Sequence, residues 1–311
     1  MSNICGVDVS KDGLDAFVAS SGQHARFDND VEGIAALGRL CAAEAVDLVV
    51  MEATGHHHRG AYLLLWQAGV KCAIVNAASV RYHARSKGFL EKTDRIDAVV
   101  IASYAAMKGV VAGDPPDIDQ LRLKSLVTRL SQVTTDLTVQ KQRLSSCTDE
   151  AMRASLDEVM AVLERQARRL EGEIASMIDD DPLWARLAEA FSSIKGVAGR
   201  TIATLMAELP EIGLISNKAA AKLAGLAPLA DDSGKRKGQR HIRGGRERVR
   251  TILYVISHHA ARYDDSLKAF HQRLIAAGKP RMVARIALAH KILVRLNAKA
   301  RDARREMMNA T

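Results

Sequence analysis

The first half of the fold is decided by two short apolar stretches, the first of which is Ile4-Cys5-Gly6-Val7-Asp8-Val9-Ser10. It leads into a Ser-Lys-Asp-Gly turn, as a β-strand does. The second, residues 45–55, is a continuous apolar run typical of a buried strand and closes in a small-residue turn. Asp8 therefore lies within a strand and Glu52 at the carboxyl end of another. A charged group in an apolar strand is costly unless it has a partner.

The segments around these two strands predict an α/β domain with a mixed sheet. Residues 14–19 and 23–27 have the pattern of short strands that form a meander with the first, and residues 71–76 that of a further buried strand. Helical patterns occupy residues 31–45, 58–68, 80–86 and 92–108. Strands that alternate with helices favour a sheet with parallel central strands, and reactive groups collect at the carboxyl ends of such strands.

Four acidic residues are candidates for a metal site in this domain. Asp94 and Asp97 are three residues apart, so on a helix they project from one face. That spacing alone is also typical of a helix cap. Together with Asp8 and Glu52 they would form a cluster of like charges that is repulsive unless cations lie among the carboxylates. Such oxygen ligands suit Mg²⁺ or Mn²⁺, and two ions about 4 Å apart stabilise both oxygens of a phosphodiester displacement.

From residue 114 the pattern changes to long helices. Apolar residues follow one 4-3 register from Leu126 to Ala151 and another from Leu156 to Met177, with a five-residue step between them. The step favours a hairpin of two antiparallel helices over one long helix with a stutter. An intramolecular bundle and a dimerising coiled coil both fit these seams. Pro182 ends the pattern.

The C-terminal part is strongly basic. Residues 191–311 carry 24 Lys/Arg and 9 Asp/Glu, so they hold all the positive excess of a chain whose net charge is +9. Within them, residues 231–250 contain eight Lys/Arg and four Gly around one hydroxyl, Ser233, and this composition predicts a loop that faces a polyanion. Residues 193–205 resemble half of a helix-hairpin-helix, a phosphate-binding turn, although a plain corner between two helices fits equally well. The predicted nucleic-acid contacts are Lys195, Arg200, Lys235, Arg236, Lys237, Arg240, Arg243, Arg246 and Arg250.

The composition and the sequence patterns argue against a membrane protein, a secreted protein and a cysteine metal site. The apolar runs are too short for a membrane span, the first ten residues lack a signal pattern, and the four cysteines have no metal-ligand spacing. We therefore expect a cytoplasmic protein without a membrane partner. Aromatic residues make up 4% of the chain, so we expect contacts to nucleic-acid backbones rather than base stacking.

Five blocks of sequence, in order, carry a family resemblance. They are Gly6-Val7-Asp8-Val9-Ser10-Lys11, Met51-Glu52-Ala53-Thr54-Gly55, Lys92-Thr93-Asp94-Arg95-Ile96-Asp97-Ala98, Gly225-Leu226-Ala227-Pro228 with Asp232-Ser233-Gly234-Lys235, and Arg250-Thr251-Ile252-Leu253-Tyr254. In order and spacing they resemble the signature blocks of the DEDD transposases of the insertion-sequence one-ten family. The likeness extends from residue 4 to about residue 300.

The resemblance implies a RuvC-like domain of the ribonuclease H class at residues 1–113, a coiled-coil assembly segment at 114–181 and a transposase domain at 182–311. It assigns Asp8, Glu52, Asp94 and Asp97 to divalent metal ions, Mg²⁺ or Mn²⁺, and the nucleophile to Ser233. It further implies a homo-oligomer that recombines DNA under the guidance of a structured bridge RNA. Whether the serine and the carboxylates act within one subunit or across two stays open.

Three other functions compete with this interpretation. A two-metal junction resolvase would need no serine chemistry, and a non-catalytic nucleic-acid-binding protein would use the acidic residues as caps and turns. The run from Val7 to Asp12 also looks like the first phosphate loop of actin-like kinases and ATPases. The basic C-terminal part and the lack of a second glycine-rich phosphate loop argue against that third class.

Overall fold

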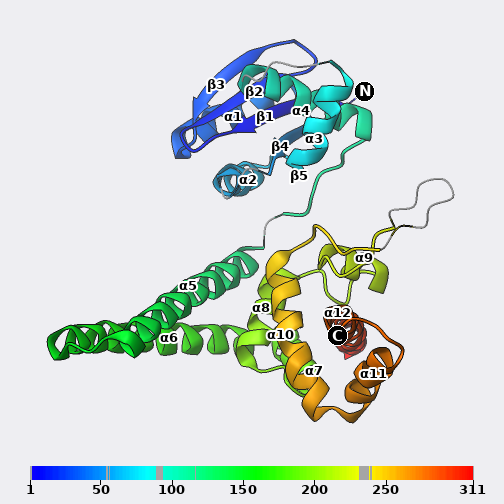
Figure 1. The fold of residues 1–311 in the computed structure, drawn as a ribbon. Helices are drawn as coiled ribbons and strands as arrows, with labels where there is room; N and C mark the ends of the chain where they lie inside the picture. The colour runs from blue at the N-terminus through cyan, green and yellow to red at the C-terminus, as the bar shows by residue number, and fades with distance from the viewer. Residues whose placement is uncertain are drawn as a thin grey trace. The chain divides into compact units, whose positions relative to one another are not determined.

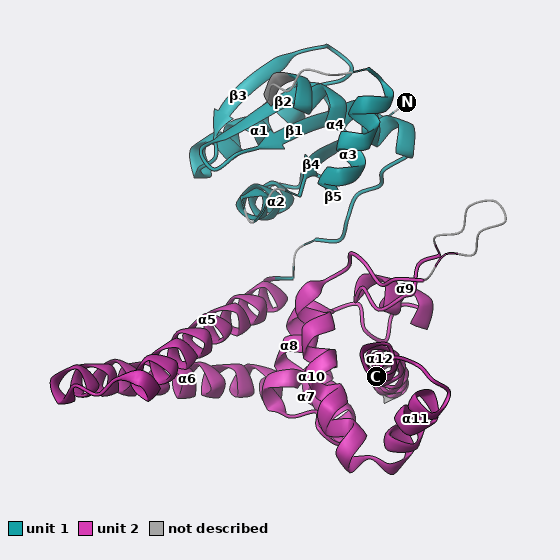
Figure 2. Cartoon of the chain, viewed as in Figure 1, with its two compact units in different colours: residues 1–117 teal, residues 118–311 magenta. Residues whose placement is uncertain are grey.

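The chain folds into two compact units, residues 1–117 and 118–311, in a computed structural model (Figure 2). The structure describes residues 2–53, 55, 57–88, 94–115, 117–230, 238 and 240–310, and the side chains of residues 94, 95 and 310 also fall outside the description. No helix within these ranges has the length and apolar character needed to cross a membrane.

The first unit is built on a five-stranded mixed sheet with the order β3-β2-β1-β4-β5 (Figure 1). Its strands are β1 (Ile4–Val9), β2 (Gly13–Val18), β3 (His24–Asp28), β4 (Leu48–Glu52) and β5 (Cys72–Val75). The first three form the predicted antiparallel meander, and β4 and β5 continue the sheet parallel to β1. The tight turn between β1 and β2 is closed by Ser10, whose hydroxyl accepts a hydrogen bond from the Gly13 amide at 2.9 Å.

Helices cover both faces of this sheet. They are α1 (Val31–Ala43), α2 (His58–Gln67), α3 (Ala77–Ser86) and α4 (Asp94–Lys108). Side chains alternate along a strand, so Cys5, Val7 and Val9 of β1 pack in a core with α1 and α2. Ile4 of β1 and Val50 of β4 pack in the opposite core with α3 and α4. The domain is therefore the α/β domain that the sequence predicts.

The second unit begins with a long antiparallel helical hairpin, α5 (Ile118–Ser146) and α6 (Glu150–Asp180) (Figure 1). Asp149 caps α6 by accepting a hydrogen bond from the Met152 amide at 2.9 Å. An ion pair of 3.4 Å between Lys141 and Glu164 joins the two helices. The hairpin that the five-residue step favours is thus confirmed. Its use in assembly stays a prediction.

The remaining helices form one core with the base of this hairpin. They are α7 (Pro182–Ser192), α8 (Gly199–Glu208), α9 (Asn217–Leu223), α10 (Glu247–Tyr263), α11 (Asp265–Ala276) and α12 (Arg281–Ala310). α12 supplies fully buried leucines and the buried Asn297. The Asn297 side chain accepts a hydrogen bond from the Gly213 amide at 2.8 Å and donates one to the Ile215 carbonyl at 3.0 Å, which fixes the connection between α8 and α9.

The predicted α/β domain with a mixed sheet, followed by an all-helical part, is confirmed. The three-part division of the chain stays a prediction, because the compact units are defined by packing alone. By packing, the α5–α6 hairpin belongs to the same compact unit as the C-terminal helices.

Candidate active site

Asp8 and Glu52 lie side by side at the carboxyl ends of neighbouring parallel strands. The register pairs Val7 of β1 with Met51 of β4, so the next residues along, Asp8 and Glu52, follow as the next pair. Residues in register on parallel strands point to the same face of a sheet. By alternation, Asp8 and Glu52 share the face of Ile4 and Val50, which is the face that α3 and α4 cover. Both side chains are half-buried.

The helix α4 crosses this face in direct contact with β1. A Cβ atom added at Gly6 would lie 2.2 Å from the carbonyl oxygen of Ala98 and 2.6 Å from the Ala102 nitrogen. Only glycine at residue 6 leaves room for the helix backbone at this distance. The buried residues of α4 include a stripe formed by Ala98, Ile101, Ala102 and Ala105. Asp97 lies one turn before Ile101, at the N-terminal end of that stripe.

The direction of α4 brings its N-terminus to the edge of the sheet that holds Asp8 and Glu52. After α4 ends, the Gly113 amide donates a hydrogen bond of 2.9 Å to the carbonyl of Cys72, the first residue of β5. The C-terminal end of α4 is therefore near the amino ends of the parallel strands, and its N-terminal end is near their carboxyl ends. Asp94, whose side chain lies outside the described residues, is the first residue of the helix.

A third carboxylate lies in the same row of the sheet. Asp15 of β2 is paired directly with Asp8, and Arg26 of β3 is paired with Asp15. The Arg26 guanidinium donates a hydrogen bond of 2.9 Å to the Asp15 carboxylate. One row across the sheet thus reads Arg26, Asp15, Asp8 and Glu52. Sequence reasoning missed Asp15, although the short Ser10 to Gly13 turn sets the register that pairs it with Asp8.

The residues present fit a hard divalent cation. Asp8 and Glu52 supply neighbouring carboxylate oxygens in this row, and carboxylate oxygens are the ligands that Mg²⁺ and Mn²⁺ prefer. Among the described side chains, no three His, Cys, Asp or Glu groups converge as a metal site. Asp94 lies outside that set.

Asn29 joins the loops that follow β1 and β4. Its side-chain amide donates hydrogen bonds to the Ser10 carbonyl at 2.8 Å and to the His57 carbonyl at 3.3 Å. Both loops leave the edge of the sheet that carries Asp8 and Glu52, so Asn29 holds that edge together.

In the second unit, the described residues on either side of residues 231–237 form a tightly packed stem. Leu229 and His241 form an isolated antiparallel bridge, with N to O distances of 3.0 and 3.3 Å. Below the bridge, a Cβ atom at Gly225 would lie 2.2 Å from the Gly244 oxygen, and one at Gly245 would lie 2.3 Å from the Gly225 nitrogen. Ser233, Lys235, Arg236 and Lys237 themselves lie outside the described residues.

Two family models match this chain. The model of the DEDD transposases of the IS110 type matches residues 5–153, and that of the transposase IS116/IS110/IS902 family matches residues 188–272. The chain belongs to the IS110 family of transposases. Asp8, Glu52 and Asp97 fall within the first match, and the Ser233 loop falls within the second.

The IS110-family transposase is also similar to known individual proteins. It is 25% identical to the pilin gene-inverting protein of Moraxella bovis and 24% identical to that of Moraxella lacunata, in each case over 93% of this chain and 92% of the relative. Among solved structures, RuvC of T. thermophilus in complex with a Holliday junction substrate matches with a TM-score of 0.26 and 12% identity, over 36% of this chain and 99% of that one.

Two basic residues next to the Ser233 segment that are predicted to contact nucleic acid, Arg246 and Arg250, have partners within the transposase. Both terminal nitrogens of Arg246 bind the Glu211 carboxylate at 2.5 Å, and one also donates to the Glu208 carbonyl at 3.0 Å. Burial raises the pKa of Glu211, but the hydrogen bonds and charge of Arg246 outweigh burial and hold that pKa below its ordinary 4.5. Arg250 donates to the Gly244 carbonyl at 2.6 Å. Both arginines therefore brace the stem, whereas Arg240 and Arg243 are exposed.

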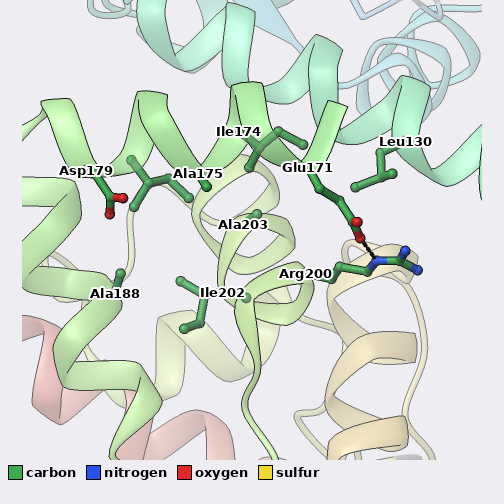
Figure 3. A pocket seen from close by; sticks show the side chains of 11 residues that line it. Leu130, Glu171, Ile174, Ala175, Asp179, Ala188, Arg200, Ile202 and Ala203 are labelled. Atoms are coloured by element: carbon green, nitrogen blue, oxygen red, sulfur yellow. Dashed lines mark hydrogen bonds and ion pairs between the residues drawn. The ribbon is translucent and has the colours of Figure 1, made fainter. Parts of the chain in front are cut away.

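The turn between α7 and α8 carries the other two predicted contacts. Gly196 adopts a φ of +91°, and Lys195 before it is exposed. Arg200, in the first turn of α8, forms an ion pair with Glu171 of α6. Figure 3 shows this pair at one end of a mainly apolar cavity of about 340 Å³, with Asp179 at the other end. Nucleic-acid binding by Lys195 and Arg200 stays a prediction.

Proposed function

We propose that this IS110-family transposase cuts and rejoins DNA strands through a covalent intermediate on Ser233, assisted by divalent ions held at Asp8, Glu52, Asp94 and Asp97. The observation that carries the proposal is the convergence of Asp8 and Glu52 in one row of the sheet, at the edge reached by the N-terminus of α4. An all-oxygen donor set at that edge suits Mg²⁺ or Mn²⁺. Two ions bound there would stabilise the attacking and leaving oxygens of a phosphodiester.

The serine step keeps the energy of the broken phosphodiester bond in a phosphoserine linkage. The Ser233 oxygen forms a bond to phosphorus while one phosphorus–oxygen bond of the strand breaks. The serine proton is lost to a base and the departing DNA oxygen takes up a proton. A hydroxyl of a second DNA strand then attacks the phosphoserine, which joins the strands and restores the serine. A serine hydroxyl is a weak nucleophile, so this step needs strong electrostatic stabilisation.

Exposed basic residues of the second unit supply the contact to nucleic acid. Exposed Lys195, Arg240 and Arg243 are available for phosphate groups, and contacts to phosphates position a strand without reading its sequence. A guide RNA that pairs with the DNA would supply sequence recognition, as the family resemblance implies. We include in the proposal a homo-oligomer, to which the α5–α6 hairpin contributes, and action in the cytoplasm.

Trapping a covalent adduct tests the serine step. Purified protein, Mg²⁺, element-end DNA and the transcript flanking the element are combined, and a denaturing gel is scored for protein–DNA adduct and for joined product. We expect Ser233→Ala to lose both and Ser145→Ala, at the tip of the hairpin, to keep both. An adduct formed by Ser233→Ala would overturn the assignment. Cleavage without any adduct in the wild type would favour a two-metal resolvase.

Metal binding is tested separately from activity. We expect Asp8→Asn and Glu52→Gln each to weaken Mn²⁺ binding measured by electron paramagnetic resonance, and to abolish cleavage in Mg²⁺. Glu32→Gln, an exposed carboxylate in the first turn of α1, is the matched control and keeps wild-type Mn²⁺ affinity. Unchanged Mn²⁺ affinity in both Asp8→Asn and Glu52→Gln would contradict the metal assignment.

A further inference from the structure

A second pocket, of about 720 Å³, lies between α10, α11 and α12. It is lined by Tyr254 and His258 of α10, His271, Gln272, Ile275 and Ala276 of α11, and Arg281, Met282 and Arg285 of α12. Pockets that take small organic ligands have volumes of about 300–1,000 Å³. This volume therefore suits more than a simple ion.

One side of the pocket is cationic. Arg281 and Arg285 contribute full positive charges, and the lining residues include no Asp or Glu. Arg285 is held in place because it donates a hydrogen bond of 3.0 Å to the Ser257 carbonyl of α10. The first turn of α12 forms part of the same wall, and amide groups in the first turn of a helix have no partner within the helix. All these features favour an anion.

His271 contributes a buried polar atom to the pocket. Its Nε2 atom is buried and has no hydrogen-bond partner among the described residues. Burial first, and then the charges of Arg285 and His258, hold the pKa of His271 below its ordinary 6.5. Burial, Arg285 and His259 have the same effect on the pKa of His258. Both rings are therefore mainly neutral at pH 7, and a bound anion would favour their protonated, hydrogen-bond-donating forms.

The other side of the pocket is apolar and aromatic. Tyr254, Ile275 and Met282 line it, and the Tyr254 ring is fixed by an edge contact with His258 at a centroid distance of 5.0 Å. An aromatic face beside a cationic wall matches a molecule with a flat ring and a phosphate group. Bases stack on tyrosine rings while arginines bind the adjoining phosphate.

We propose that the pocket between α10, α11 and α12 binds one phosphorylated nucleotide of a single-stranded nucleic acid, away from the Ser233 loop in sequence. Arg281, Arg285, His258 and His271 bind the phosphate, and Tyr254 stacks on the base. The step from nucleotide to nucleic-acid strand rests on the proposed function. The pocket itself requires neither the serine chemistry nor the metal ions.

The test uses full-length Ser233→Ala protein without divalent ions, so that it is independent of cleavage. Histidine side chains labelled with ¹⁵N are followed by nuclear magnetic resonance, with His258→Gln and His271→Gln used to assign the signals. The probes are inorganic phosphate, a 5′-phosphorylated tetrathymidylate and a 5′-phosphorylated tetrauridylate. We expect the oligonucleotides to raise the pKa of both histidines by about one unit. The two oligonucleotides show whether DNA or RNA binds better.

Two variants and a control distinguish binding of the phosphate group from binding of the base. Arg281→Gln is expected to weaken oligonucleotide binding about tenfold, because it removes a charge-assisted hydrogen bond. Tyr254→Ala weakens binding of the oligonucleotides but not of phosphate. Lys268→Gln removes an exposed charge of α11 outside the pocket and changes neither. The proposal would be overturned if neither oligonucleotide changed the histidine signals. It would also be overturned if Arg281→Gln and Lys268→Gln lost equal amounts of oligonucleotide affinity.

Discussion

Gly6 of β1 and Ala98 of α4 are packed so closely that a Cβ atom at residue 6 would lie 2.2 Å from the Ala98 carbonyl oxygen. Asp8 lies two residues after Gly6, on the same face of the sheet, and Asp97 is the residue before Ala98. The contact therefore sets the separation between a strand carboxylate and a helix carboxylate. It gives the glycine of the first signature block a physical role that is separate from the chemistry.

Gly6→Ala is expected to destabilise the first unit, because its methyl group has to displace helix backbone rather than a flexible side chain. Overpacking of this kind costs about 1–3 kcal/mol. Urea unfolding measures the cost, and Mn²⁺ binding should weaken in parallel as α4 moves. Gly60→Ala is the control, since nothing lies within 4 Å of its Cβ position inside α2. It should be neutral or stabilising by about 0.5–1 kcal/mol. Wild-type stability in Gly6→Ala would contradict the packing.

Gly245→Ala is expected to disrupt the stem of the Ser233 loop. Residue 245 has a φ of +71°, and its Cβ atom would lie 2.3 Å from the Gly225 nitrogen. Left-handed strain of about 1 kcal/mol adds to the overlap. Adduct formation by Ser233 should fall sharply, while the helix content measured by circular dichroism changes little. Gly199→Ala has open space at its Cβ and should keep both properties. If adduct formation survives in Gly245→Ala, the stem does not position the serine.

The ion pair between Glu211 and Arg246 predicts a pH dependence of stability. The folded state holds the pKa of Glu211 below its ordinary 4.5, so the pair stabilises the fold above pH 4.5. The contribution is lost as the pH falls through the lowered value. At pH 7 we expect Glu211→Gln to cost about 1 kcal/mol, since the pair is partly solvent-screened. The difference between wild type and variant in chemical unfolding should shrink below pH 4.5. A constant difference between pH 7 and pH 3 would contradict this assignment.

Much of the first unit follows from the sequence because its strands carry strong patterns. The apolar run that ends at Glu52 and the alternating run that contains Asp8 predict two neighbouring strands, and both strands are present. The lateral pairing of Asp8 with Asp15 could not be predicted in the same way. It depends on the exact register of β1 and β2, and a shift of one residue would turn Asp15 to the other face.

The patterns in the sequence do not predict α7 and α11 of the second unit, for a different reason. In the sequence, Pro182 marks the end of the hairpin pattern. In the structure, Asp181 also begins α7, because its side chain accepts a hydrogen bond of 2.8 Å from the Trp184 amide. Asp264 begins α11 in the same manner, at 3.0 Å from the Leu267 amide. Both sites carry an ordinary N-cap signal. Proline in the first turn is compatible with a helix start as well as with a break.

The basic residues of the Ser233 region show where sequence reasoning stops. Arg243 and Arg246 are three residues apart and look equivalent in the sequence, yet Arg243 is exposed and Arg246 binds Glu211. Glu211 lies far away along the chain, with no pattern that links it to Arg246. The two arginines therefore provide a direct comparison between a phosphate contact and an internal brace.

Arg243→Gln is expected to weaken binding of element-end DNA at every sequence tested and to leave thermal stability unchanged. Loss of one phosphate contact lowers the slope of log affinity against log salt concentration by about 0.9. Arg246→Gln should lower the melting temperature, because it leaves the Glu211 carboxylate without its bidentate partner, at a cost of about 1–3 kcal/mol. Its salt slope should remain that of the wild type, since the Arg246 guanidinium is already bound to a carboxylate. A reduced salt slope in Arg246→Gln with an unchanged melting temperature would reverse the two roles.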